Sequence, residues 1–156
     1  MRNQELSRQL QKLRALIKKF SESGIQDLEL QAQWGKYLCV LVAGFLENGI
    51  AEVYGSFVKG AASETVANFS RSVLNRVQNP KSKHFLEIAK SFKAQWADEL
   101  RQFLEEENRK EAIDTIMSNR HLIVHGRDSS ITVARVVSYL DKCVEVVEFI
   151  EGQCTR

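Results

Sequence analysis

The chain is poor in residues that interrupt helices and in features of secreted or membrane proteins. It has one proline and eight glycines in 156 residues, which leaves little room for linkers or disordered segments. Its three cysteines include no Cys-x-x-Cys pair, so we expect free thiols in a reducing cytoplasm. The polar N-terminus lacks the apolar core of a signal peptide. The longest apolar run, residues 38–46, is shorter than the about 20 residues that cross a membrane, and no membrane association is expected.

A strong charge of either sign is also missing. The net charge is +2 at pH 7, far below the strongly cationic balance of a dedicated duplex-binding domain. Basic residues within 8–19 and 71–93 could contact phosphates, although exposed cations of this kind are more often simply solvated. The length suffices to bury a core, and we expect one domain over residues 1–156.

The chain has helical periodicity from end to end and no convincing strand pair. Apolar residues spaced three and four apart predict helices of an all-α fold. Asn108 with Glu111 resembles a capping box, Gly126 is expected just after a helix end, and Thr132 is the expected cap of the last helix. The fold class predicted is an up-and-down bundle of five to six helices. The expected segments are Leu6–Phe20, Asp27–Tyr54, Ser63–Val77, Ser82–Phe103 (continuous or kinked), Arg109–His125 and Val133–Ile150, with Gly152 closing the last.

The most distinctive stretch is Arg-His-Leu-Ile-Val-His-Gly, residues 120–126, which holds two of the three histidines. On a helical wheel, Arg120 falls in the middle of the apolar stripe of its helix. Burying an unpaired guanidinium costs several kcal/mol. Arg120 therefore needs a partner, which could be an acid, a water-filled cleft or a bound phosphate.

The two histidines of this stretch, His121 and His125, lie four residues apart and share one helix face. Arginine binds phosphate in a bidentate manner, and histidine transfers protons near neutral pH. Together they suit RNA transesterification, in which the 2′-hydroxyl attacks the adjacent phosphate. Three alternatives stay open: His125 merely ends a helix, Arg120 pairs with a buried acid, or the histidines bind a metal. For a metal, the glutamate of zincins and a third ligand are missing, and neither a metal nor a cofactor is expected.

Arg-x4-His followed by glycine, late in an all-α chain of this size, resembles the R-x4–6-H motif of the HEPN superfamily. The stretch NRHLIVHG, the Ser-containing turn after it and the Val-rich last helix are most similar to the RiboL-PSP-type HEPN branch. The resemblance implies a HEPN helical bundle and a metal-independent endoribonuclease that acts as a homodimer with a composite cleft. It further implies RNA as substrate, a toxin or defence role, and an antitoxin or other protein as a partner.

The resemblance also implies roles for individual residues. Arg120 would position and neutralise the scissile phosphate, His125 would move protons, and His121 would orient the site or contact RNA. Glu47 is the candidate for the acid that approaches the arginine from the second helix, unless it simply reaches solvent, and Asn48 is a weaker alternative. Many HEPN proteins only bind RNA, nucleotides or partner proteins, so a non-catalytic binding module is the alternative function, and a purely structural bundle is a third.

Overall fold

The computed structural model describes residues 1–155, which form seven α-helices and no strand. The all-α prediction is confirmed, but the expected number of five to six helices is too low. The helices are α1 (Gln4–Glu22), α2 (Leu28–Ala61), α3 (Glu64–Leu74), α4 (Ser82–Phe92), α5 (Ala94–Glu105), α6 (Arg109–Val124) and α7 (Val133–Cys154).

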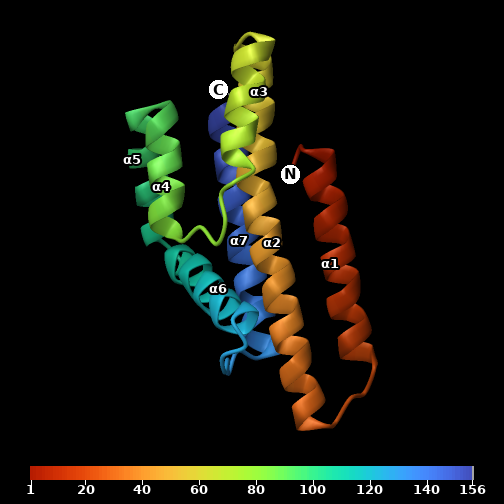
Figure 1. Ribbon diagram of the computed structural model, residues 1–156. Helices are drawn as coiled ribbons and strands as arrows, with labels where there is room; N and C mark the ends of the chain where they lie inside the picture. Colours follow the sequence, from red (N-terminus) through yellow and green to blue (C-terminus); the bar gives the residue numbers. More distant parts are fainter. Residues whose placement is uncertain (156) are drawn as a thin grey trace.

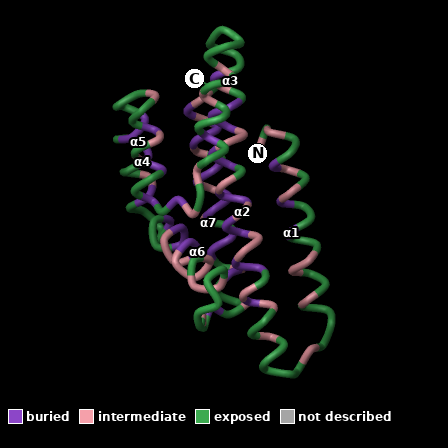
Figure 2. Tube along the Cα trace, viewed as in Figure 1, coloured by how far each residue is buried: buried purple, intermediate pink, exposed green. Residues whose placement is uncertain are grey.

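Two long helices, α2 and α7, lie side by side through the middle of the molecule (Figure 1). Helices α1, α3 and α6 pack against α2, and α4 and α5 form a pair at one side. Buried residues concentrate where the helices face one another, while the outer faces of α1 and α3 are exposed (Figure 2). The C-terminal part of α6 lies across α2, where Arg120 meets Glu47.

Helix α2 is long and apolar enough to span a membrane by length and composition alone. Most of its apolar stretch, however, is buried inside the protein, as in a core helix. It continues to Ala61 rather than ending near Tyr54, and Gly55 lies buried within it. Packing against α3 and α7 therefore outweighs the helix-weakening effect of glycine.

Other helix boundaries differ from the sequence prediction where tertiary contacts decide. The expected fourth segment divides at Lys93, whose backbone is extended (φ −150°, ψ 132°). The predicted capping box is wrong, because Asn108 is left-handed (φ 59°) and makes no side-chain cap bond. The carboxylate of Glu111 instead accepts hydrogen bonds from Tyr139 and Arg135 of α7, at 2.7 and 3.0 Å. Helix α7 also runs through Gly152.

The predicted cap of α7 is confirmed, because the Thr132 hydroxyl accepts a hydrogen bond from the Arg135 N–H at 3.2 Å. This cap fixes where the chain returns from the end of α6 to the central helix pair. The same region touches α2, since Gly35 packs against the backbone just before α7.

The contact at Gly35 leaves no room for a side chain. A β-carbon there would lie 2.5 Å from the Ile131 carbonyl oxygen. We expect Gly35→Ala to lower the free energy of unfolding by about 1–3 kcal/mol, the usual cost of overpacking, measured by urea denaturation. Gly44→Ala is the matched control, because nothing lies within 4 Å of a β-carbon at Gly44. It should be neutral or stabilising by up to about 1 kcal/mol, and equal losses in both variants would contradict this interpretation.

Candidate active site

The Arg120–Gly126 stretch forms the C-terminal end of α6, where this helix meets α2. The helix ends in a Schellman motif, since Gly126 is left-handed (φ 66°). The Arg127 N–H donates to the Leu122 carbonyl at 2.8 Å, and the Gly126 N–H donates to the Ile123 carbonyl at 3.1 Å. Gly126 thus has the helix-ending role predicted from the sequence, and His125 becomes the C-cap residue.

Arg120 points from α6 towards α2, where it meets Glu47. The two side chains are 25% and 21% exposed, and the Arg120 Nη2 atom lies 3.8 Å from the Glu47 Oε1 atom. This distance is an ion pair but exceeds hydrogen-bond length. Within residues 1–155 the guanidinium has no hydrogen-bond partner. Most of its five N–H donors are therefore available to an anion.

The carboxylate of Glu47 is held in place by the connection between α3 and α4. Its Oε1 atom accepts a hydrogen bond from the Asn79 backbone N–H at 2.5 Å. Asn79 is left-handed (φ 51°) and directly precedes Pro80, which is buried. Asparagine tolerates this conformation better than most residues. The Glu47 carboxylate thus makes a short hydrogen bond to the α3–α4 connection and a longer ion pair with Arg120.

His121 and His125 are both exposed, and their ring centroids lie 4.4 Å apart at an angle of 59°. On the wheel of α6 they lie roughly 100° and 140° from Arg120. The histidines therefore face solvent while Arg120 faces α2. Within residues 1–155, no group of three or more His, Cys, Asp or Glu side chains is arranged to hold a metal ion.

Three other residues with polar or reactive side chains have separate structural roles. The Asn48 side-chain amide donates to Gln9 of α1 at 3.1 Å, so this weaker candidate is engaged away from Arg120. His84 accepts a hydrogen bond from the Lys81 N–H at the start of α4. Burial raises the pKa of the Cys39 thiol to about 12, and a hydrogen bond with the Arg120 backbone offsets part of this rise. The uncharged thiol packs α2 against α6, 3.5 Å from the Ile116 carbonyl.

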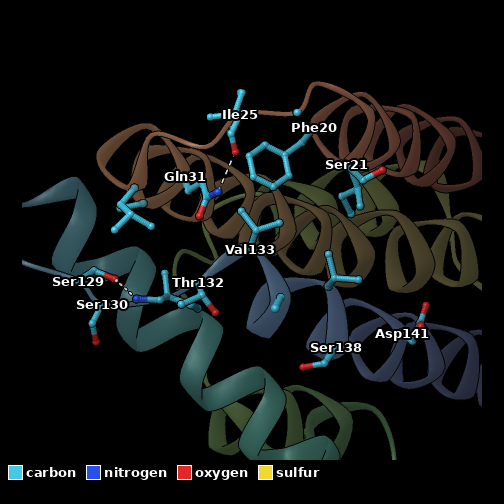
Figure 3. Close-up of a pocket in the computed structure, with 17 residues that line it drawn as sticks. Phe20, Ser21, Ile25, Gln31, Ser129, Ser130, Thr132, Val133, Ser138 and Asp141 are labelled. Carbon is cyan, nitrogen blue, oxygen red and sulfur yellow. Dashed lines mark hydrogen bonds between the residues drawn. The ribbon is translucent and has the colours of Figure 1, made fainter.

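A large cavity lies away from these residues. It measures about 970 Å³ and opens between the end of α1, the beginning of α2 and the beginning of α7 (Figure 3). Its wall is mainly apolar, as at Phe20, Ile25 and Val133, and Gln31 spans it by donating to the Ile25 carbonyl at 2.8 Å. None of Glu47, Arg120, His121 and His125 lines it. We therefore do not assign the phosphate chemistry to this cavity.

A smaller cleft, of about 450 Å³, opens beside the Arg120–Gly126 stretch. One wall comes from α2 and the other from the end of α6. None of Arg120, His121, His125 and Glu47 lines it, because it forms where two helices far apart in the sequence cross. Its lining residues are Gln33, Lys36, Tyr37, Val40, Ile123, Gly126, Arg127 and Asp128.

Comparison with protein families gives one match to this chain. The model of the RiboL-PSP-HEPN family covers residues 4–156 and so spans all seven helices and the Arg120–His125 motif. No curated protein and no solved structure matches the chain significantly.

Proposed function

Because the chain belongs to the RiboL-PSP-HEPN family, and HEPN domains are generally associated with ribonuclease activity, we propose that it is a metal-independent endoribonuclease. Its main support is the Arg120 guanidinium, which is mostly buried yet has no hydrogen-bonded anion among residues 1–155. The Glu47 carboxylate lowers the cost of burying this charge without occupying its donors. Two exposed histidines follow within five residues. Arginine and histidine together supply charge neutralisation and proton transfer at a phosphate.

The reaction is an attack of the RNA 2′-hydroxyl on the adjacent phosphorus. The bond from phosphorus to the 5′-oxygen breaks, and the products end in a 2′,3′-cyclic phosphate and a 5′-hydroxyl. Arg120 binds two non-bridging oxygens and offsets the negative charge that builds on them. The imidazole of His125 either accepts the 2′-hydroxyl proton or donates one to the leaving 5′-oxygen. His121, whose ring is 4.4 Å away, orients His125 or contacts RNA.

A second copy of the chain supplies the missing half of this site. Within one chain, Arg120 faces α2 while His125 faces solvent, roughly 140° around the helix. A two-fold pairing near the ends of α6 would bring His125 of each copy towards Arg120 of the other. We expect a symmetric homodimer that buries more than about 1,000 Å² in total. Light scattering at micromolar concentration should give twice the chain mass of 17.8 kDa, and a monomer would contradict the composite site.

The direct test is cleavage of single-stranded RNA by the wild-type protein in EDTA. We expect products with 2′,3′-cyclic phosphate ends. RNA that is bound but left intact would identify a non-catalytic binding module, and cleavage only after a divalent metal is added would contradict metal independence. The biological role that we propose is that of a cytoplasmic toxin or defence effector, with an antitoxin or another protein as a further partner.

A further inference from the structure

The cleft between α2 and α6 has the composition of a nucleotide-binding subsite. We propose that it holds single-stranded RNA on one side of the scissile phosphate, with a base stacked on Tyr37 and phosphates bound by Lys36 and Arg127. All three residues line the cleft. This inference rests on the proposed ribonuclease function, because it assigns the path by which the substrate reaches Arg120.

The cleft residues of α2 lie on the same face of this helix as Glu47, the partner of Arg120. Gln33, Lys36, Tyr37 and Val40 fall with Glu47 in an arc of roughly 100° on the wheel of α2. At 1.5 Å per residue, Tyr37 lies about 15 Å from Glu47 along the helix axis. Gly44 lies on the same face, and a β-carbon there would meet nothing within 4 Å. This face of α2 is therefore uncrowded at Gly44, between Tyr37 and Glu47.

Tyr37 is a suitable stacking platform because its ring is half exposed and supported from behind. The side chain is 50% exposed. Its ring makes an edge contact with Trp34 at a centroid distance of 5.7 Å, and Trp34 in turn contacts Phe20 at 5.5 Å. Proteins that bind single strands stack bases on such exposed aromatic rings, and every base has a face that can stack.

The charges of the cleft favour a polyanion over an uncharged ligand. Lys36 and Arg127 have no carboxylate within 4 Å among residues 1–155, so both can bind phosphate. The exposed cations of other helices differ, since several pair with acids of their own helix, at 3.6–3.8 Å for Arg8, Lys18 and Lys83. Asp128 is the one carboxylate among the lining residues and opposes the two cations.

The test measures binding of a fluorescently labelled single-stranded RNA in a His125→Ala background, so that the RNA stays intact. Tyr37→Ala should weaken binding by about 5- to 150-fold, the usual effect of losing one stacked base. Tyr37→Phe keeps the ring and should bind like the parent. Phe69→Ala is the matched control, because Phe69 is 70% exposed on α3, beside the opposite end of α2 (Figure 1).

The phosphate contacts have a separate signature in salt. Lys36→Gln and Arg127→Gln should each reduce the slope of log affinity against log salt by about 0.7, whereas Lys83→Gln, on the outer surface of α4, should leave it unchanged. Asp128→Asn should tighten binding by about two- to three-fold, since it removes one repulsive charge near the phosphates. A gain of this sign cannot come from loss of folding.

The outcomes separate the cleft from the catalytic function. If the wild-type protein cleaves RNA and Tyr37→Ala binds and cleaves equally well, the cleft proposal is wrong and the ribonuclease stands. If the wild type binds RNA without cleaving it and Tyr37→Ala loses that binding, the cleft stands and the ribonuclease fails. A wild type that neither binds nor cleaves overturns both. A changed mass of Tyr37→Ala in light scattering would show a contact between copies and would also overturn the cleft proposal.

Discussion

Replacing His125 with alanine should lower the rate of RNA cleavage by about 10²–10⁴-fold, the usual effect of removing a general acid or base. His125 is exposed at the C-cap of α6 and lies outside the core formed by residues 1–155. The variant should therefore fold and unfold like the wild type. The rate is measured under single-turnover conditions in EDTA, which separates the chemical step from product release.

His84→Ala is the matched control for this experiment. His84 is also exposed, but its ring accepts a hydrogen bond at the start of α4 and lies outside the Arg120–Gly126 stretch. Its removal should cost stability at that helix end and leave the cleavage rate within about two-fold. Full activity of His125→Ala would refute the assigned proton transfer.

Arg120→Ala should lower the cleavage rate by about 10²–10³-fold, comparable to the loss of one charge-stabilising donor in other enzymes. The effect on stability should be small, below about 1 kcal/mol. The ion pair with Glu47 is long at 3.8 Å, and Glu47 keeps its hydrogen bond from Asn79 after the substitution. A large loss of activity with a small loss of stability would separate a phosphate-binding arginine from a structural one.

Arg120→Lys distinguishes charge from geometry at this position. Lysine keeps the positive charge but lacks the planar fork that binds two phosphate oxygens, so an intermediate rate is expected. Arg101→Ala serves as the control, because Arg101 pairs with Asp98 on the surface of α5, at 2.7 Å. A loss of several kcal/mol of stability in Arg120→Ala, with activity retained, would identify Arg120 as a structural cation.

The parts of the fold that local rules govern could be predicted from the sequence. The all-α class followed from apolar periodicity, and the roles of Thr132 and Gly126 followed from helix-end chemistry that involves only neighbouring residues. The failures share a different cause. Asn108 and Glu111 looked like a capping box, but Glu111 is drawn to Tyr139 and Arg135 on α7. Such competition between helices leaves no local signal.

The candidate site divides in the same way. The wheel position of Arg120 implied a polar partner, and the family resemblance directed attention to Glu47, which the structure brings to 3.8 Å. The hydrogen bond from Asn79 to Glu47 could not be predicted, because the Asn79–Pro80 pair indicates only a helix stop. The cleft beside Tyr37 could not be predicted either, because it forms only where α2 and α6 cross.

The aromatic rings that contact Tyr37 include a tryptophan, so the intrinsic fluorescence of the protein can report on ligand binding at this surface. Trp34 contacts Tyr37 directly and is partly open to solvent, so its fluorescence responds to whatever covers that ring. The other tryptophan, Trp96, is 5% exposed and packs among Phe57 and Phe92 at the α4–α5 side. Its emission follows the integrity of that cluster instead. With the other tryptophan replaced by phenylalanine, each indole would report on its own region: Trp34 on the surface and Trp96 on the interior.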